Sequence, residues 1–96
     1  METNNFIRKK GMEEFYKQFS KKLLFYGYYK NYTLIATIEF DNKILISVGN
    51  KGDNIELTEL EITEIMQELE LQNKNYKTWK REIIRGVMTQ FFELDN

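Results

Sequence analysis

Three glutamates follow one another at helical spacing near the middle of the chain, at Glu61, Glu64 and Glu68. Paired carboxylates can act as general acid and base, or can hold a hard cation, when a fold converges them on one buried site. Steps of three and four residues instead place them in a row along one side of a helix. We therefore expect an acidic ridge that docks on a basic surface, rather than a catalytic pair.

The composition excludes most other chemistry. The 96-residue chain contains no histidine and no cysteine. Serine–histidine and cysteine–histidine nucleophile pairs, disulfides and the usual zinc sites are therefore excluded. A phosphate-binding loop motif is also missing. We predict a protein that is not an enzyme, with no catalytic residue, no metal site and no cofactor.

A cluster of tyrosines is the second candidate for binding. Four of the six tyrosines lie between positions 26 and 32. Tyr28, Tyr29 and Tyr32 are candidate anchors for a protein partner, because tyrosine is enriched at the energetic centre of interfaces, or stacking partners for bases. The alternative is structural: half-buried rings with wet hydroxyls at a connection between a helix and a strand.

A basic row gives an alternative functional surface. Lys77, Arg81 and Arg85 follow at four-residue steps and would form a stripe on a helix that could bind nucleic acid. The net charge of −1 argues against this, as does the acidic middle of the chain, where residues 36–72 carry two Lys/Arg against nine Asp/Glu. Phosphates are repelled by such a surface, so protein binding is the leading interpretation.

The clearest strand signal lies between positions 31 and 49. Both arms of this segment alternate apolar and polar residues, which is typical of half-buried strands joined as a hairpin. A three-residue loop at residues 41–43 gives one face that is apolar throughout, and a slip of one residue destroys that face. The predicted register pairs Phe40 with Ile44, Ile38 with Ile46 and Ala36 with Val48. A short third strand is expected at residues 55–57.

Three helices are expected around this hairpin. Apolar residues at steps of three and four predict the first helix from Met12 to about Gly27 and the last from Tyr76 to about Phe92. Between them, Thr58 and Glu61 form a capping box that opens a helix reaching about residue 71. Its expected core stripe is Ile62, Ile65, Met66 and Leu69.

Two leucines stand apart from that core stripe. Leu60 and Leu71 are eleven residues apart, close to three helical turns, and would therefore share one side of the helix nearly opposite the core. This side would face either a second packed layer or a second copy of the chain. A homodimer through Leu60 and Leu71 is thus one expectation.

The resulting fold class is α+β, with an N-terminal helix, an antiparallel two- to three-stranded β-meander and two C-terminal helices. At 96 residues we expect a single domain, with residues 1–11 as an arm. The sequence has no run apolar enough to span a membrane and no secretory signal. We therefore expect a cytoplasmic protein without membrane contact.

In size, single-domain form, lack of catalytic residues and residue usage, the chain resembles the small inhibitors carried by phages and mobile elements, such as anti-CRISPR and other anti-defence proteins. The resemblance implies inhibition by contact with a protein partner, for example a nucleic-acid-handling complex whose basic groove receives the acidic ridge. It covers no defined stretch, so no functional position follows from it.

Overall fold

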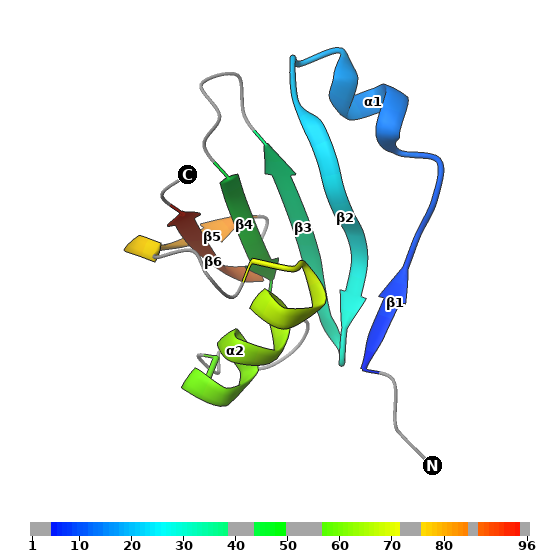
Figure 1. Ribbon diagram of the computed structural model, residues 1–96. Helices are drawn as coiled ribbons and strands as arrows, with labels where there is room; N and C mark the ends of the chain where they lie inside the picture. Colours follow the sequence, from blue (N-terminus) through cyan, green and yellow to red (C-terminus); the bar gives the residue numbers. More distant parts are fainter. Residues whose placement is uncertain (1–4, 39–43, 50–56, 72–75, 85–86, 95–96) are drawn as a thin grey trace.

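A six-stranded antiparallel sheet forms the body of the protein, in the strand order β1-β2-β3-β4-β6-β5 (Figure 1). The computed structural model describes residues 5–38, 44–49, 57–71, 76–84 and 87–94. The strands are β1 Phe6–Arg8, β2 Lys22–Tyr29, β3 Tyr32–Ile38, β4 Ile44–Gly49, β5 Tyr76–Ile84 and β6 Val87–Leu94, and the helices are α1 Glu13–Lys17 and α2 Glu59–Glu68. The expected α+β meander with three helices is therefore wrong.

In place of the predicted N-terminal helix, the structure has a short helix followed by the first part of a strand. Only the five residues of α1 are helical, and β2 begins at Lys22. The stretch from Leu24 to Tyr29 is rich in aromatic residues, which favour strands, and alternate residues of β2 are buried. Pairing of β2 with strands on both sides outweighs the helical spacing in this segment. Part of the segment expected as an arm, Phe6–Arg8, forms β1.

The predicted last helix is a hairpin. Strands β5 and β6 pair along their length, with Ile84 opposite Val87 at the closed end. The two residues between them, Arg85 and Gly86, lie outside the described residues. A glycine between two apolar segments is a hairpin signal, whereas the helical interpretation placed it in a helix interior, where it costs about 1 kcal/mol. The predicted helix is therefore wrong, because this segment forms two strands, in which side chains repeat every two residues and not every 3.6.

The hairpin of β3 and β4 has the expected apolar face but a different register. Ile38 pairs with Ile44, Ala36 with Ile46 and Leu34 with Val48. This register is two residues away from the predicted one, so the same side chains still share a face, because side chains alternate with a period of two. The predicted loop at residues 41–43 lies outside the described residues, as do residues 55 and 56 of the predicted third strand. Leu57, the last residue of that predicted strand, is described and is not part of a strand.

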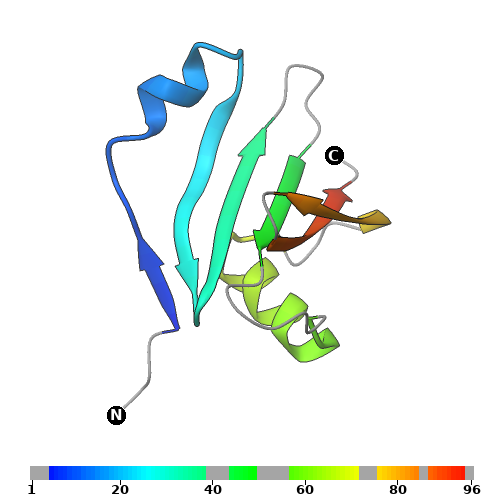
Figure 2. The ribbon, with the colours of Figure 1, turned by 180° about the vertical axis from the view of Figure 1, so that it is seen from behind.

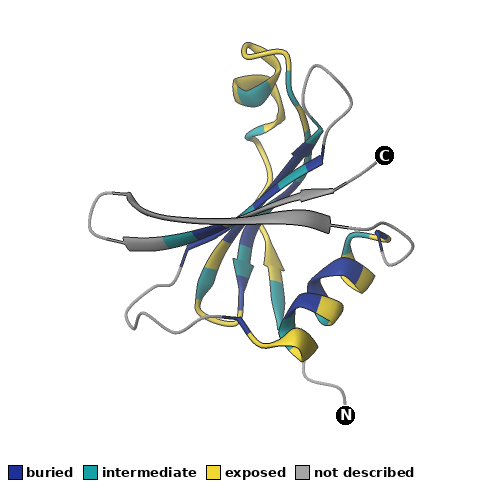
Figure 3. Cartoon of the chain, turned by 90° about the vertical axis from the view of Figure 1, so that its left-hand side faces the viewer, coloured by how far each residue is buried: buried dark blue, intermediate teal, exposed yellow. Residues whose placement is uncertain are grey.

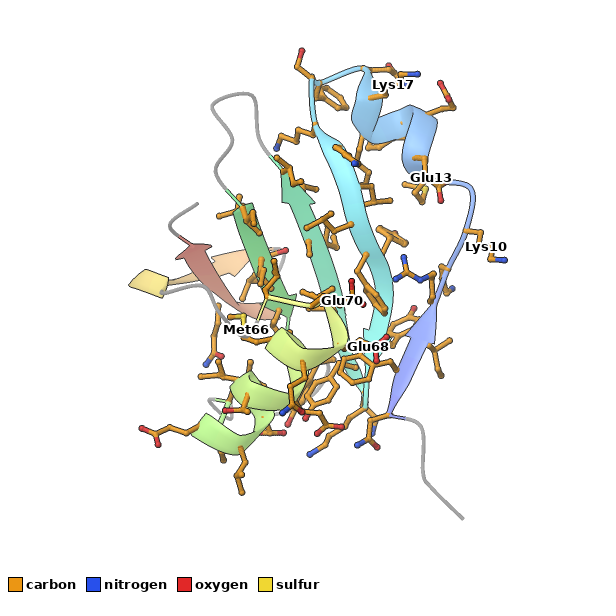
Figure 4. All side chains as sticks on the ribbon, in the orientation of Figure 1. Lys10, Glu13, Lys17, Met66, Glu68 and Glu70 are labelled. Atoms are coloured by element: carbon orange, nitrogen blue, oxygen red, sulfur yellow. The ribbon has the colours of Figure 1, made fainter. Side chains whose placement is uncertain are left out.

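One face of the sheet holds the hydrophobic core under α2. Figure 3 shows the buried residues of α2 turned toward the sheet and its exposed residues turned to solvent. Figure 4 labels Met66, whose side chain lies on the sheet side of the helix. The core consists of Phe25, Tyr29, Leu34, Ala36, Ile44, Ile46, Val48, Leu57, Ile62, Ile65, Met66 and Leu71. The predicted stripe of α2 is thus confirmed at Ile62, Ile65 and Met66, and Leu69 is half-buried against the core.

Helix α2 has a well-defined start and end. The predicted capping box is confirmed, with the Thr58 hydroxyl accepting from the Glu61 backbone N–H at 3.1 Å. At the other end, Glu70 adopts a left-handed conformation with φ of 58°. The Leu71 N–H donates to the Met66 carbonyl at 2.7 Å and the Glu70 N–H to the Gln67 carbonyl at 3.1 Å, the two bonds of a Schellman motif. This turn carries Leu71 back into the core.

Replacing Glu70 by glycine should stabilise the protein. A left-handed conformation costs an L-residue about 1–2 kcal/mol, and glycine is relieved of most of that strain. We expect a gain of about 1 kcal/mol in the free energy of unfolding, measured by urea titration. The matched control is Gln67→Gly, at an exposed position with ordinary helical backbone, which should lose up to about 1 kcal/mol. Equal losses from both variants would contradict the assigned conformation.

Candidate functional site

The acidic row of α2 is divided between structural and exposed carboxylates. Glu61 completes the capping box, since its Oε1 accepts from the Thr58 backbone N–H at 2.9 Å. Its Oε2 accepts from the Lys30 ammonium at 3.1 Å, and the Glu61 side chain is only 13% exposed. Burial raises the pKa of Glu61, but the bond from Thr58 and the charge of Lys30 outweigh it, and the net pKa is below its ordinary value.

Glu64 is a second structural carboxylate. Its Oε2 accepts from the Tyr29 hydroxyl at 2.9 Å, and its Oε1 accepts from the Asn5 side-chain amide at 2.9 Å. Burial raises the pKa of Tyr29 well above its ordinary value, and the hydrogen bond to Glu64 raises it further. Glu64 therefore joins α2 to the residue before β1 and to the end of β2.

Glu68 is the member of the predicted ridge that is exposed. It is the last residue of α2 and is labelled, with Glu70, in Figure 4. The exposed carboxylates of this helix are Glu59 at its start and Glu68 at its end, followed by Glu70 in the turn. The carboxylates that α2 exposes are therefore not the whole predicted ridge, because Glu61 and Glu64 make contacts within the fold.

The three predicted tyrosines do not share one surface. Tyr29 is fully buried on the α2 side of the sheet, and the half-buried Tyr32 pairs with it, with ring centroids 6.1 Å apart. Tyr28 lies on the other face of β2, where the Lys9 ammonium is 5.1 Å from the centre of its ring. Tyr29 is therefore part of the core, as in the structural alternative for the cluster, and is not exposed as an anchor for a partner.

The two leucines expected on one side of the helix separate completely. Leu60 is 82% exposed, whereas Leu71 is 8% exposed and belongs to the core. The argument from three helical turns is wrong because α2 ends at Glu68 and the left-handed Glu70 redirects the chain. A self-association surface built on both leucines is thus not present.

The basic stripe is not a helical stripe. Lys77 and Arg81 lie on β5, an edge strand of the sheet, and Arg85 lies outside the described residues. The pairing of β5 with β6 shifts between Tyr76 and Thr78, so Lys77 stands at an irregularity.

An open groove of about 740 Å³ runs beside the outer face of α2. Its helical lining includes Leu60, Thr63, Glu64 and Gln67, which follow at steps of three and four and therefore share one face of the helix. Lys30 and Glu61 line the groove as well. The sequence analysis did not predict Thr63 and Gln67 as part of this surface. Their spacing of three and four residues from Leu60 places them on the side of the helix opposite the core stripe.

No cluster of metal-binding side chains and no membrane-spanning helix is found in the described part of the chain. Within it, no group of three or more carboxylates is placed so as to hold a metal ion. None of the described helices is long and apolar enough to cross a membrane. Comparisons with protein-family models, curated proteins and solved structures gave no match.

Proposed function

We propose that this chain is a non-enzymatic binding module that inhibits or modulates a protein partner through the outer face of α2. The observation that carries the proposal is Leu60, a large apolar side chain 82% exposed on a helical face with Glu59 beside it and Glu68 further along the helix. An exposed apolar anchor on a helix that also presents carboxylates to solvent is an arrangement with which a helix docks in a complementary groove.

The charges of α2 support a basic partner. The helix carries four glutamates in ten residues and no basic residue in its last turn. A carboxylate at the C-terminal end of a helix opposes the helix dipole, which costs about 0.3–1 kcal/mol at an exposed position. Glu68 stands at that end, followed by Glu70. The fold gains little from either charge, which favours a role in recognition.

The proposed partner is a protein with a basic groove, such as one that ordinarily receives nucleic acid. Carboxylates along an exposed helix present negative charge at intervals and would attract the lysines and arginines of such a groove. The resemblance to small anti-defence inhibitors supports the same class of partner. Because Tyr29 is buried and Tyr28 lies on the other face, the tyrosine cluster is not part of the proposed contact.

Leu60→Glu tests this proposal. Leu60 is so exposed that its replacement should not disturb the fold, whereas loss of a central anchor should weaken binding by about tenfold or more. The measurement is retention of a stoichiometric protein from nuclease-treated bacterial lysate on the immobilised chain, followed by titration of the purified partner. Glu59→Lys with Glu68→Lys should slow association and reduce its salt dependence.

The matched control is Glu14→Lys, the same charge reversal on an exposed residue of α1. It should leave partner binding unchanged. If the partner binds wild type, Leu60→Glu and Glu14→Lys equally well, the outer face of α2 is only a solvated surface and the proposal fails.

A further inference from the structure

The face of the sheet opposite α2 is a second surface of different character. Figure 2 shows this side, with α2 behind the sheet and α1 at one end of β2. On β2 the side chains alternate, so Phe25 and Tyr29 are buried under α2 whereas Tyr26 and Tyr28 are half-buried on the opposite face. Two tyrosines two residues apart therefore lie along one strand of this face.

Aromatic rings continue from β2 onto α1 without a break. The Tyr26 ring is 6.2 Å from the Tyr16 ring, which is 5.3 Å from the Phe15 ring. The Phe15 ring in turn is 5.4 Å from that of Phe19. Phe15 and Phe19 are 47% and 57% exposed, unusual for phenylalanine. We call these rings, together with Tyr28, the aromatic ribbon: Phe19, Phe15, Tyr16, Tyr26 and Tyr28.

Positive charges lie along the aromatic ribbon. Residues 9–22 contain five lysines against two glutamates. Arg8 is not part of this group, because its guanidinium lies 4.7 Å from the ring centre of Phe25 on the α2 side. Lys10 and Lys17 are exposed, and Figure 4 shows both side chains directed outward from the connection after β1 and from α1. Lys9 lies over the ring of Tyr28 at 5.1 Å. The interleaving of cations and rings is the chemistry of a surface that takes an anion carrying flat, stackable groups.

The acidic residues of α2 do not oppose this surface, because the sheet lies between them. Glu61 and Glu64 bond to Lys30, Tyr29 and Asn5 on the α2 side. The small net charge of the whole chain therefore conceals two separated regions, acidic on α2 and basic along residues 9–22. Binding of a polyanion depends on the local field, which is positive here.

We propose that the aromatic ribbon and its lysines bind single-stranded nucleic acid, a function beyond the proposed protein contact on α2. Single strands are favoured over duplexes because exposed rings stack on unpaired bases, which a duplex does not offer. A membrane surface is disfavoured because α1 has only five residues, too short for the extended apolar face that lies in a bilayer interface.

Fluorescence anisotropy with labelled oligothymidylate and oligouridylate tests the proposal, against a mixed-sequence duplex of the same length. We expect the single strands to bind more tightly than the duplex. Phe15→Ala with Phe19→Ala should weaken single-strand binding by about fivefold to a hundredfold, the effect of losing a stacked base. Lys10→Gln with Lys17→Gln should lower the slope of log affinity against log salt by about 1.4, for two lost phosphate contacts.

Leu60→Ala is the matched control, because it removes an exposed apolar side chain from the other side of the sheet. It should leave oligonucleotide affinity unchanged, which also separates this proposal from the one for α2. Undiminished binding by the phenylalanine variant would overturn the inference, as would equal affinity for duplex and single strands. Binding to vesicles of phosphatidylglycerol but to no oligonucleotide would assign the surface to a membrane instead. Comparison of the two oligonucleotides distinguishes RNA from DNA as the preferred strand.

Discussion

Gly27→Ala is expected to detach β1 from the sheet and to lower the free energy of unfolding by about 3 kcal/mol, the upper range for overpacking a core position. A Cβ at Gly27 would overlap the carbonyl oxygen of Ile7 and would lie 2.9 Å from the Ile7 carbonyl carbon and 3.1 Å from the Arg8 Cα. These are backbone atoms, so no flexible side chain can move aside. Glycine is required because β1 approaches β2 this closely.

Two measurements separate local detachment from global unfolding. Urea titration followed by circular dichroism gives the loss of global stability. Trypsin reports on β1 itself, because Arg8, Lys9 and Lys10 are cleavage sites that pairing with β2 protects, for example through the Lys9 N–H to Tyr26 carbonyl bond of 2.7 Å. We expect rapid cleavage at these sites in Gly27→Ala.

The matched control is Gly11→Ala. A Cβ at Gly11 meets no atom within 4 Å, although its φ of 97° makes alanine strained there. A loss of about 1 kcal/mol is expected, without the new trypsin cleavage. If Gly27→Ala instead matches wild type in both measurements, the close approach of β1 to β2 is wrong.

Tyr29→Phe is expected to cost about 2 kcal/mol and to change how stability depends on pH at the alkaline side. The lost hydroxyl is a buried donor to the Glu64 carboxylate at 2.9 Å, and hydrogen bonds to charged groups contribute about 1.5–3 kcal/mol. The phenylalanine ring still fills the core, so the variant creates no large cavity. The lost stability therefore measures the missing hydrogen bond and the Glu64 oxygen that is left without its donor.

The sign of the pH effect follows from the raised pKa of Tyr29. Above the ordinary pKa of 10.0 the unfolded chain loses the Tyr29 proton, whereas the folded protein keeps it. The unfolded state then binds fewer protons than the folded state. The contribution of Tyr29 to the free energy of unfolding is therefore fully present below pH 10 and decreases as the pH rises above it. For one group this decrease is at most about 1.4 kcal/mol per pH unit. Tyr29→Phe should remove this part of the alkaline loss.

Urea titrations between neutral pH and the alkaline limit measure this difference. Burial and Tyr26 also raise the pKa of Tyr16, so a smaller alkaline loss should remain in Tyr29→Phe. Glu64→Gln is the second variant, because its amide oxygen can still accept from Tyr29 while the charge is gone. Its alkaline loss should be reduced but present. Parallel pH profiles for wild type and Tyr29→Phe would show that Tyr29 is not held protonated by the fold.

The sequence predicts those features that depend only on residues within one short segment. The Thr58–Glu61 capping box and the buried face of α2 depend on residues within about two turns, and both are confirmed. The alternation of β3 and β4 likewise fixed which residues face the core, although the register differs by two residues. A shift of two residues keeps the same side chains on the same face, so hydrophobic alternation alone does not determine the register.

The remaining elements depend on partners that are distant in the sequence. The segment of β2 carries apolar residues at both helical and strand spacing, and pairing with β1 and β3 decides between them. The segment of β5 and β6 is similarly ambiguous, and pairing of the two strands with each other decides its structure. Tertiary pairing therefore decides between helical and strand spacing in both segments.

The candidate site was only partly readable for the same reason. Spacing placed the glutamates on one helix, but which of them are exposed depends on Lys30, Tyr29 and Asn5, which are 31 to 59 residues away from their carboxylates. The role of Leu71 depends on the left-handed Glu70, a residue type that gives no turn signal. The continuity of the aromatic ribbon depends on α1 folding against β2.

The strand order has a consequence for how the chain is made. Strand β6 follows all the others in sequence, yet it lies between β4 and β5. Chains emerge from the ribosome N-terminus first, so β4 remains an open edge until residues 87–94 are available to pair with it. An open edge carrying Ile44, Ile46 and Val48 is a template for pairing between chains. We expect a nascent chain stalled before β6 to aggregate or to recruit chaperones, whereas the complete hairpin closes that edge.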